Sequence, residues 1–471
     1  TLVMMAVFIP ASFMPGITGQ LYQQFALTIA CSLGLSWLVA MTLTPALSGQ
    51  ILKPGGDTAG NRFTLGFNRG FERLTSRYIG MVKSMLQRRR IGMVLLGAIS
   101  IATAAMFFLV PTGFVPQEDQ GYVIVSVQMP AGTALARTEK NMAQASDIIR
   151  GVEGVEHTIA ISGFDLLTAT PTTNAGTVFV LLKSYGEREN TADEIVTLLR
   201  QQLTQVESAL CLPLNAPPIQ GLSSTGGFEL VVEDRAGAGE EELWGATWAM
   251  IGFAKERIPQ LGPLFSTFQI DAPRLYANIN KDKAALNGVS LPSIYQTMQA
   301  NLGSLYVNDF NKYNQIYRVY IQAAQDQRSD PKDIEQLYVR NNQGDMIPLG
   351  QFVSVEHRAA ANIVTRYNLF NAAHIIGGPA PGHSSGQALF IMDRLASHML
   401  PEGFGYEWTG TAYQQQKAGN TAPIIFGLAL ILVFLIIAAL YESWLLPLVI
   451  MLSVPLGMFG ALGFQWARGL A

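Results

Sequence analysis

The sequence predicts a membrane α-helical bundle joined to a large α+β region, and three observations lead to this prediction. Of the 471 residues, 49% are hydrophobic and only 14% are charged, against about 25% charged in ordinary globular proteins. Four runs without a charged residue are long enough to cross a bilayer. The remaining polar sequence, 111–420, alternates strand-like and helix-like segments. This composition excludes a disordered or fibrous chain.

The charge-free runs are the predicted membrane spans. A helix of about 20 residues rises about 30 Å, which matches the hydrocarbon core. The spans are 25–47, 91–110, 422–440 and 445–466, with 1–13 as the truncated end of a fifth. Burial inside a large soluble protein is the competing interpretation, but four such runs disfavour it. Because both ends of the chain lie in or close to apolar runs, we expect a piece of a longer membrane protein.

The charged residues predict the orientation of the spans. The segment 48–90 carries nine Lys and Arg residues against two acidic ones, whereas 111–420 carries 21 basic and 31 acidic residues. Short basic loops stay in the cytoplasm, so 111–420 should lie on the opposite side. A basic block is also typical of nucleic-acid binding, but the apolar flanks favour the membrane, and we expect no nucleic-acid partner.

Within the basic loop, residues 62–86 predict an amphipathic helix. Its apolar side chains recur every three or four residues, which places them on one helical face. They are Phe63, Phe67, Phe71, Leu74, Tyr78, Met81 and Met85. Such a helix lies in the membrane interface against lipid. Docking on the cytoplasmic ends of other helices is the alternative.

The first part of the polar region predicts a ferredoxin-like split βαβ unit. The turn Pro130–Thr133 should cap the first helix, and Thr191 should cap the second. The expected order is strand 121–129, helix 134–150, strand 155–161, strand 177–183, a helix after Thr191 and a strand near 209–214.

A second copy of this unit is interrupted by an inserted subdomain. The copy consists of strand 228–233, helix 240–258, strand 264–270, strand 371–377, helix 384–398 and strand 405–409. The insert contains helix 290–302, a strand pair around Val307–Tyr320 and strand 337–340. The expected division is spans 1–47, loop 48–90, span 91–110, subdomain 111–215, subdomain 216–272 with 351–420, insert 273–350 and spans 421–471.

One segment resembles an enzyme motif. Residues 382–386 fit G-x-S-x-G, in which Ser384 would be the nucleophile of a membrane-anchored serine hydrolase. The three residues 379–381 separate Ser384 from the preceding strand, and no Asp…His pair follows at a suitable distance. A helix cap is the better interpretation of Ser384. The two cysteines and five histidines show no metal-ligand spacing, so we expect no enzyme, metal or cofactor.

Short motifs distributed along the whole chain resemble the resistance–nodulation–cell division (RND) transporters, in particular the hydrophobe/amphiphile multidrug efflux type. No single motif is specific, but all occur in the order found in the family. They are LTPAL at 43–47, GFVPQEDQG at 113–121, GSLYVNDF at 303–310, PAPG at 379–382, WTG at 408–410, ALYESW at 439–444 and VPLG at 454–457.

The resemblance implies a proton-driven efflux transporter of the bacterial inner membrane with a large periplasmic domain. It implies a homotrimer that joins a periplasmic adaptor protein and an outer-membrane channel and exports small amphiphilic substrates. The chain would cover the end of the fifth to the ninth transmembrane helix, with two porter subdomains and an inserted docking subdomain. The proton relay of the family lies on helices outside this chain, so no relay residue is assigned. Metal-exporting and protein-export accessory members of the superfamily remain alternatives.

The resemblance also implies site residues. The cleft wall would be formed by Ile124, Ser126, Phe164, Leu166, Phe179, Leu210, Leu212 and Leu214. A glycine-containing switch loop at 162–176 would include Ser162, Gly163, Asp165, Asn174 and Gly176. A docking hairpin would include Val307, Asn308, Asp309 and Phe310.

Overall fold

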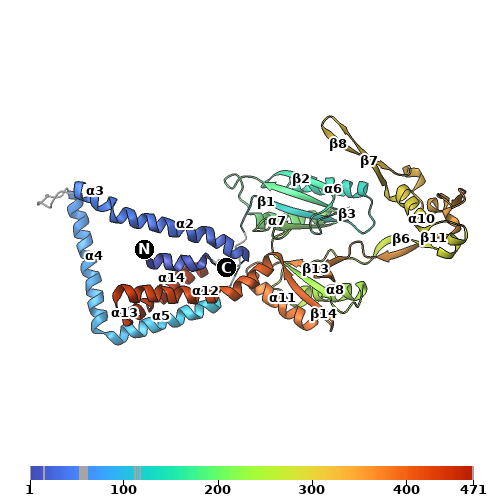
Figure 1. The fold of residues 1–471 in the computed structure, drawn as a ribbon. Helices are drawn as coiled ribbons and strands as arrows, with labels where there is room; N and C mark the ends of the chain where they lie inside the picture. The colour runs from blue at the N-terminus through green and yellow to red at the C-terminus, as the bar shows by residue number, and fades with distance from the viewer. Residues whose placement is uncertain are drawn as a thin grey trace.

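The fold is elongated and has three parts along one axis. The computed structural model describes residues 2–13, 16–51, 62–110, 113, 115 and 118–468. Figure 1 shows the apolar helices at one end, two sheet-containing subdomains in the middle, and a smaller subdomain with a long hairpin at the other end. Part of the predicted basic loop, 52–61, and part of the motif at 113–121 lie outside the described residues.

The apolar end is built from α1 (Leu2–Ala11), α2 (Gly16–Met41), α3 (Leu43–Ile51), α5 (Arg89–Leu109), α12 (Gly410–Tyr441), α13 (Leu445–Met451) and α14 (Val454–Ala467). By length and composition, four stretches of this part can cross a membrane: Gly19–Ile51, Arg89–Leu109, Ile424–Tyr441 and Leu445–Ala467. The four predicted spans are therefore confirmed as long apolar helices. The last is interrupted between α13 and α14, where Pro455 lies in the first turn of the new helix and has no N–H to continue the old one.

The amphipathic helix is confirmed as α4 (Arg62–Gln87). Figure 1 shows it crossing the far end of the helical part, from α3 to α5. Its apolar residues Phe67, Phe71, Leu74, Tyr78 and Met81 are 61–69% exposed. Since no described helix covers this apolar face, its geometry favours the interpretation as an interfacial helix over docking on other helices.

The first sheet has the predicted β-α-β-β-α-β order. It comprises β1 (Tyr122–Gln128), α6 (Leu135–Arg150), β2 (Val155–Asp165), β3 (Thr170–Leu182), α7 (Ala192–Gln202) and β4 (Leu210–Asn215), with spatial order β2-β3-β1-β4. The Thr191 cap is confirmed, because its side chain accepts from the Glu194 N–H in a capping box. The predicted cap of α6 is wrong: Ala134 is the N-cap, and the Thr133 hydroxyl donates to Pro130 O within its own turn.

The second sheet repeats this plan in the order β12-β13-β5-β14. Its elements are β5 (Phe228–Asp234), α8 (Glu240–Arg257), β12 (Thr365–Tyr367), β13 (Phe370–Gly377), α11 (Ser385–Met399) and β14 (Phe404–Thr409). The predicted strand 264–270 is wrong, because Phe265 makes only an isolated bridge to Ile376. Pro263 lacks the N–H of a ladder residue, and the Ser266 hydroxyl accepts the Phe268 N–H instead of leaving it for a strand.

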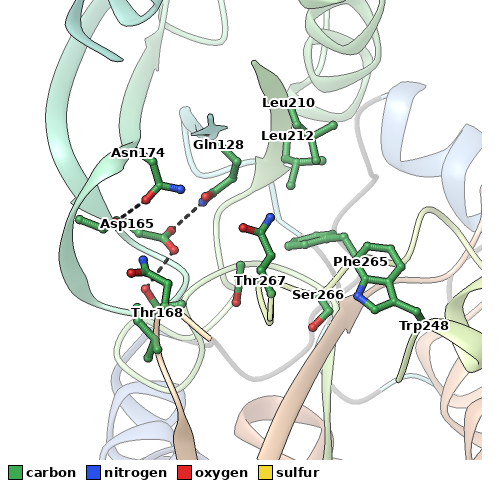
Figure 2. Close-up of a pocket in the computed structure, with 14 residues that line it drawn as sticks. Gln128, Asp165, Thr168, Asn174, Leu210, Leu212, Trp248, Phe265, Ser266 and Thr267 are labelled. Carbon is green, nitrogen blue, oxygen red and sulfur yellow. Dashed lines mark hydrogen bonds between the residues drawn. The ribbon is translucent and has the colours of Figure 1, made fainter. Parts of the chain in front are cut away.

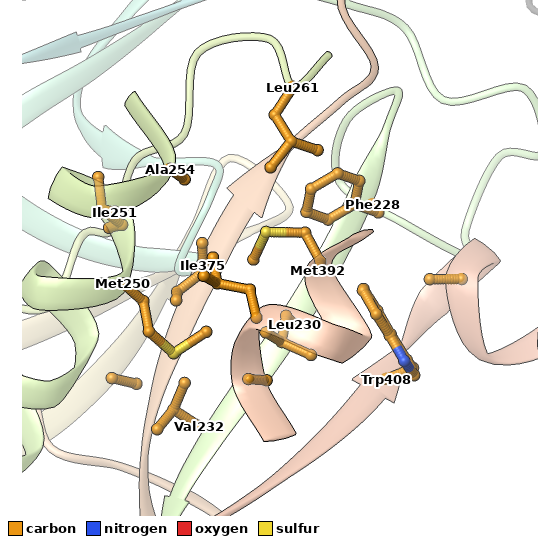
Figure 3. Close-up of a cluster of buried hydrophobic side chains, with 14 of the residues drawn as sticks. Phe228, Leu230, Val232, Met250, Ile251, Ala254, Leu261, Ile375, Met392 and Trp408 are labelled. Carbon is orange, nitrogen blue, oxygen red and sulfur yellow. The ribbon is translucent and has the colours of Figure 1, made fainter. Parts of the chain in front are cut away.

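Each sheet buries one face under its helices. In the second sheet, alternate residues of β5 and β13, among them Leu230 and Ile375, pack against Met250 of α8 and Met392 of α11. Figure 3 shows these side chains together with Trp408 of β14. The first sheet does the same with Val123, Val125 and Val127 of β1 and their neighbours. Because side chains alternate along a strand, the remaining residues of both sheets form a second face without helices.

The inserted segment has its own core. The ribbon β6 (Ala272–Ile279) and β11 (Val353–Ala360) leads to α9 (Lys281–Leu286), α10 (Leu291–Met298), a π-helical turn (Gln299–Gly303), hairpin β7 (Leu305–Lys312) and β8 (Gln315–Ile321), and the short pair β9 (Tyr338–Arg340) and β10 (Met346–Pro348). Ile294, Val339, Leu349 and Phe352 are buried in it. The predicted strand pair around Val307–Tyr320 is confirmed as β7–β8.

Candidate functional site

The face of the first sheet that lacks helices carries most of the predicted cleft-wall residues. Ile124 lies opposite Phe179 on β3 and Leu214 on β4, and Ser126 lies opposite Leu212. Directly opposed residues share a face of an antiparallel sheet. This face therefore gathers Ile124, Ser126, Phe179, Leu210, Leu212 and Leu214.

A cavity of about 110 Å³ lies between this face and the second subdomain. Leu210 and Leu212 line it from β4, and Trp248 of α8 and Phe265 line it from the other side. Figure 2 shows the aromatic rings of Trp248 and Phe265 beside each other, with the polar side chains of Gln128, Asp165 and Asn174 gathered on the opposite side. The cavity thus combines apolar groups, at Leu210, Leu212, Trp248 and Phe265, with polar groups at Gln128, Asp165 and Asn174, and Ser266, Thr267 and Gln269 add polar groups from the second subdomain.

The predicted switch loop is a β-hairpin, so the expectation of an irregular loop at 162–176 is wrong. The ladder between β2 and β3 continues through Ser162 opposite Gly176 and Phe164 opposite Pro171, and Asp165 closes it against Thr170. A register shift falls between Ser162 and Phe164, where Gly163 of β2 stands against residues 172–175 of β3. Gly163 has a φ of +81°, in the left-handed region that glycine tolerates.

Hydrogen bonds hold the hairpin against β1. Asp165 is 3% exposed, and its Oδ1 accepts from Gln128 Nε2 at 3.0 Å and from Leu167 N at 3.1 Å. Its Oδ2 accepts from the Thr168 hydroxyl at 2.9 Å. Asn174 Nδ2 donates to Met129 O at 3.1 Å. The tip of the hairpin is therefore positioned by side chains that also line the cavity.

A second cavity, of about 510 Å³, lies on the other side of the hairpin. Gly163 and Pro171 line it from the hairpin, and Pro273 and Arg274 line it from β6. Thr172, Asn174, Asn362 and Ile363 line both cavities. The hairpin and the segment 362–363 therefore separate an inner cavity, the smaller one, from an outer cavity.

The other six predicted residues of the cleft wall do not line the inner cavity. Ile124 and Ser126 are buried in the sheet. Phe164, Leu166, Phe179 and Leu214 are half-buried and line neither the inner nor the outer cavity. Cys211 points to the core side of β4, where burial raises the pKa of its thiol to about 11. This thiol therefore stays protonated at neutral pH and is a poor nucleophile.

Among the lining residues that the sequence did not predict are Gln128, Trp248, Phe265 and Asn362. Gln128 continues the alternation of Ile124 and Ser126 along β1, so strand periodicity could have found it. The other three come from the second subdomain, and only tertiary packing brings them to the first.

The predicted docking hairpin is exposed along both strands. Val307 and Phe310 of β7 are half exposed, and the Phe310 ring stacks on Tyr317 of β8 at 5.4 Å between centroids. Asn308 and Asp309 lie between them, opposite Val319 and Arg318. The hairpin therefore presents both apolar and polar groups beyond the body of the subdomain.

Ser384 is a helix cap, as predicted. Its buried hydroxyl accepts the Gln387 N–H, and the Gln387 side chain accepts the Ser384 N–H in return. His398 lies at the far end of the same helix and contacts Arg394 O. This geometry does not support a nucleophile. In the ranges that the structure describes, no group of three His, Cys, Asp or Glu side chains could hold a metal ion.

Comparison with known proteins gives a consistent match. The AcrB/AcrD/AcrF family matches residues 1–471. The chain is 36% identical to multidrug resistance protein MdtF of Escherichia coli O157:H7, over 100% of the chain and 46% of MdtF. It is 36% identical to multidrug export protein AcrF of Escherichia coli K12 over 98% of the chain and 45% of AcrF. It is 34% identical to toluene efflux pump membrane transporter TtgE of Pseudomonas putida over 100% of the chain and 45% of TtgE. The chain thus spans about half the length of the curated relatives it matches.

Proposed function

Because the chain belongs to the AcrB/AcrD/AcrF family, we propose that it forms part of a proton-driven transporter of the bacterial inner membrane that exports amphiphilic compounds. The proposal assigns the first and second sheet subdomains as porter subdomains, and the inserted segment as a docking subdomain, on the periplasmic side. The basic loop with α4 faces the cytoplasm, as its nine basic residues favour. The observation that carries the proposal is the pair of cavities divided by the β2–β3 hairpin.

The walls of the inner cavity suit an amphiphile. Leu210, Leu212, Trp248 and Phe265 offer apolar area, and each Å² of ligand surface removed from water there contributes about 25 cal/mol. The opposite wall offers amide, hydroxyl and carboxylate groups to the polar end of the same molecule. Such a division orients a substrate without requiring one fixed set of hydrogen bonds, which supports a broad substrate range.

Passage requires the hairpin to move. The inner cavity of about 110 Å³ is smaller than the roughly 300–1,000 Å³ of sites that hold drug-sized ligands. Thr172 and Asn174 form the partition between the two cavities. A displacement of the hairpin that widens the inner cavity and narrows the outer one would move a substrate from the outer cavity into the inner cavity.

Helix α12 is suited to transmit force from the membrane to the porter subdomains. It begins at Gly410 directly after β14 and continues into the span Ile424–Tyr441. At its start, Thr411 N donates to Ser223 Oγ at 3.2 Å and the Thr411 hydroxyl donates to Gly227 O at 3.1 Å. The porter core therefore holds the periplasmic end of a membrane helix. No proton-relay residue is assigned to this chain.

We further propose that the transporter works as a homotrimer with a periplasmic adaptor protein and an outer-membrane channel. The exposed hairpin β7–β8, with Val307, Asn308, Asp309 and Phe310, is suited to reach a neighbouring subunit. Its half-exposed apolar side chains are of the kind that protein interfaces bury. The apolar face of α4 would contact membrane lipid.

The test is to obstruct the inner cavity. In the complete transporter, expressed in a host without its own efflux pumps, Leu210→Trp is expected to lower export of bulky dyes several-fold, because Leu210 lies at the cavity wall and is 59% exposed. The larger side chain fits at the mouth without disturbing the core. Dye export rates, measured by fluorescence at equal expression, give the readout.

Ile159→Trp is the matched control. Ile159 lies on the same face of the first sheet and is 53% exposed, but it lines neither cavity. The Ile159→Trp variant should export dyes at the rate of the unmodified protein. An equal loss of dye export in the Leu210→Trp and Ile159→Trp variants, or no loss in either, would contradict a route through the inner cavity.

A further inference from the structure

The inner cavity carries a single charge. Among the residues that the structure describes, Asp165 is the one ionisable side chain in its lining. In the same described part of the chain, no Lys, Arg or His lies within ion-pair distance of its carboxylate. We propose that Asp165 selects the charge of the substrate, so that the inner cavity prefers aromatic monocations over neutral amphiphiles of similar size. This inference rests on the proposed function of the cavity.

The hydrogen bonds of Asp165 leave it able to bind a cation. All three of its partners, Gln128, Leu167 and Thr168, are neutral donors. The two oxygens of a carboxylate offer about four acceptor positions. Two bonds occupy Oδ1 and one occupies Oδ2, so Oδ2 keeps an acceptor position. A buried charge without a counter-ion is costly, and a cationic substrate would supply that counter-ion.

The opposite wall suits the aromatic part of such a substrate. Trp248 and Phe265 face Asp165 across the cavity (Figure 2). Aromatic faces stack with planar rings and attract cations as well. Trp244 lies one helical turn from Trp248, with 6.3 Å between ring centroids, and extends the aromatic surface outside the cavity. An aromatic cation can therefore contact the Asp165 carboxylate and the rings of Trp248 and Phe265 at the same time.

The outer cavity has the opposite charge. Arg274 is its one ionisable lining residue within the described ranges. The guanidinium Nη2 donates to Asn362 O at 2.7 Å and to Asn362 Oδ1 at 2.9 Å. These two neutral acceptors leave the positive charge uncompensated. A cation would thus be disfavoured beside Arg274 and favoured beside Asp165, which directs it from the outer to the inner cavity.

The experiment compares two fluorescent probes on the purified complete transporter in lipid nanodiscs. Ethidium is an aromatic cation at every pH, and N-phenyl-1-naphthylamine is a neutral aromatic amphiphile. Asp165→Asn is expected to weaken ethidium binding about tenfold, which corresponds to about 1.4 kcal/mol, and to change binding of the neutral probe less than twofold. Asp165→Glu should retain most ethidium binding because it keeps the charge.

Asp147→Asn is the matched control, since Asp147 is an exposed acid on α6 that pairs with Arg150. It should leave both dissociation constants unchanged. An equal loss for both probes in Asp165→Asn, or a loss for neither, would overturn charge selection by Asp165. Failure of the unmodified transporter to export either probe from cells would instead contradict the proposed function, so the two failures are distinguishable.

Discussion

Replacing Asp119 with alanine is expected to loosen the junction between the apolar helices and the first sheet subdomain, with a local loss of about 3–5 kcal/mol. Asp119 Oδ1 lies 2.7 Å from Arg188 Nη2, and the Arg188 side chain is 3% exposed. The Asp119 carboxylate also accepts the N–H groups of Gly121 and Ala192, the latter in the first turn of α7. Removing the carboxylate leaves a buried guanidinium without its counter-ion and two N–H groups without an acceptor.

The same pair predicts an acid-dependent stability. The Arg188 guanidinium beside Asp119 lowers the pKa of this carboxyl group below its usual 3.8. A carboxyl group whose pKa is lower in the folded state stabilises the fold fully above its unfolded pKa of about 3.9, and this contribution is lost as the pH falls through the folded value. Acidification below about pH 4 should therefore weaken the junction in the native protein but not in Asp119→Ala.

Hydrogen–deuterium exchange of the purified complete transporter measures both effects locally. Exchange in 119–122 and in the first turns of α7 should accelerate about a hundredfold for a loss of about 3 kcal/mol, while β5 is unaffected. Asp147→Ala removes an exposed acid that pairs with Arg150 on the same subdomain and should cost less than about 0.5 kcal/mol. Equal exchange in the Asp119 and Asp147 variants would show that the buried pair does not hold the junction.

Gly227→Ala should be similarly severe at the start of β5. Gly227 has a φ of +103°, and a Cβ there would overlap the carbonyl oxygen of Gly377. The left-handed conformation costs about 1–2 kcal/mol for a non-glycine residue, and forced separation of the backbones of β5 and β13 adds about 1–3 kcal/mol. Since Gly227 O also accepts the Thr411 hydroxyl, the start of α12 should loosen too.

Gly221→Ala separates the two causes. Gly221 has a φ of +82°, but a Cβ there meets nothing within 4 Å, so this variant carries only the conformational cost. Exchange in β5, β13 and the first turn of α12 should accelerate more in Gly227→Ala than in Gly221→Ala. If exchange accelerates equally in the two variants, the close approach of Gly377 is not the reason that Gly227 cannot be replaced by alanine.

The sequence predicted most elements because their causes are local. Charge-free length predicted the spans, and Thr191 predicted a helix cap that the structure confirms. The resemblance assigned Ile124, Ser126 and Phe179 to one cleft wall, and the register of β1 and β3 places these three residues on one face of the sheet.

The errors arise where tertiary contacts decide the local structure. The segment 162–176 was expected to be a loop because of its small polar residues, but its threonines are β-branched and suit a strand. Pairing resumes at Phe164, beyond the register shift, and continues to the tip. Residues 264–270 pair only through Phe265, because Pro263 and the Ser266 side chain interrupt the ladder.

Only the part of the inner cavity formed by the first subdomain could be predicted from the sequence. Leu212 and Asp165 belong to the first subdomain, whereas Trp248 and Phe265 belong to the second. No spacing in the chain encodes their approach, because it results from the packing of one subdomain on the other.

The central claim, that substrates pass the β2–β3 hairpin between the two cavities, is tested most directly by protection of Thr172→Cys from a maleimide. Thr172 lines both cavities, and the native Cys31 and Cys211 would first be replaced by serine. In the purified complete transporter, an exported amphiphile at saturating concentration should slow maleimide labelling of the Thr172→Cys variant several-fold. The labelling rate of the Ile159→Cys variant, whose cysteine lies outside both cavities, should not change. Unaltered labelling at position 172, with the same compound exported at the normal rate, would contradict this route.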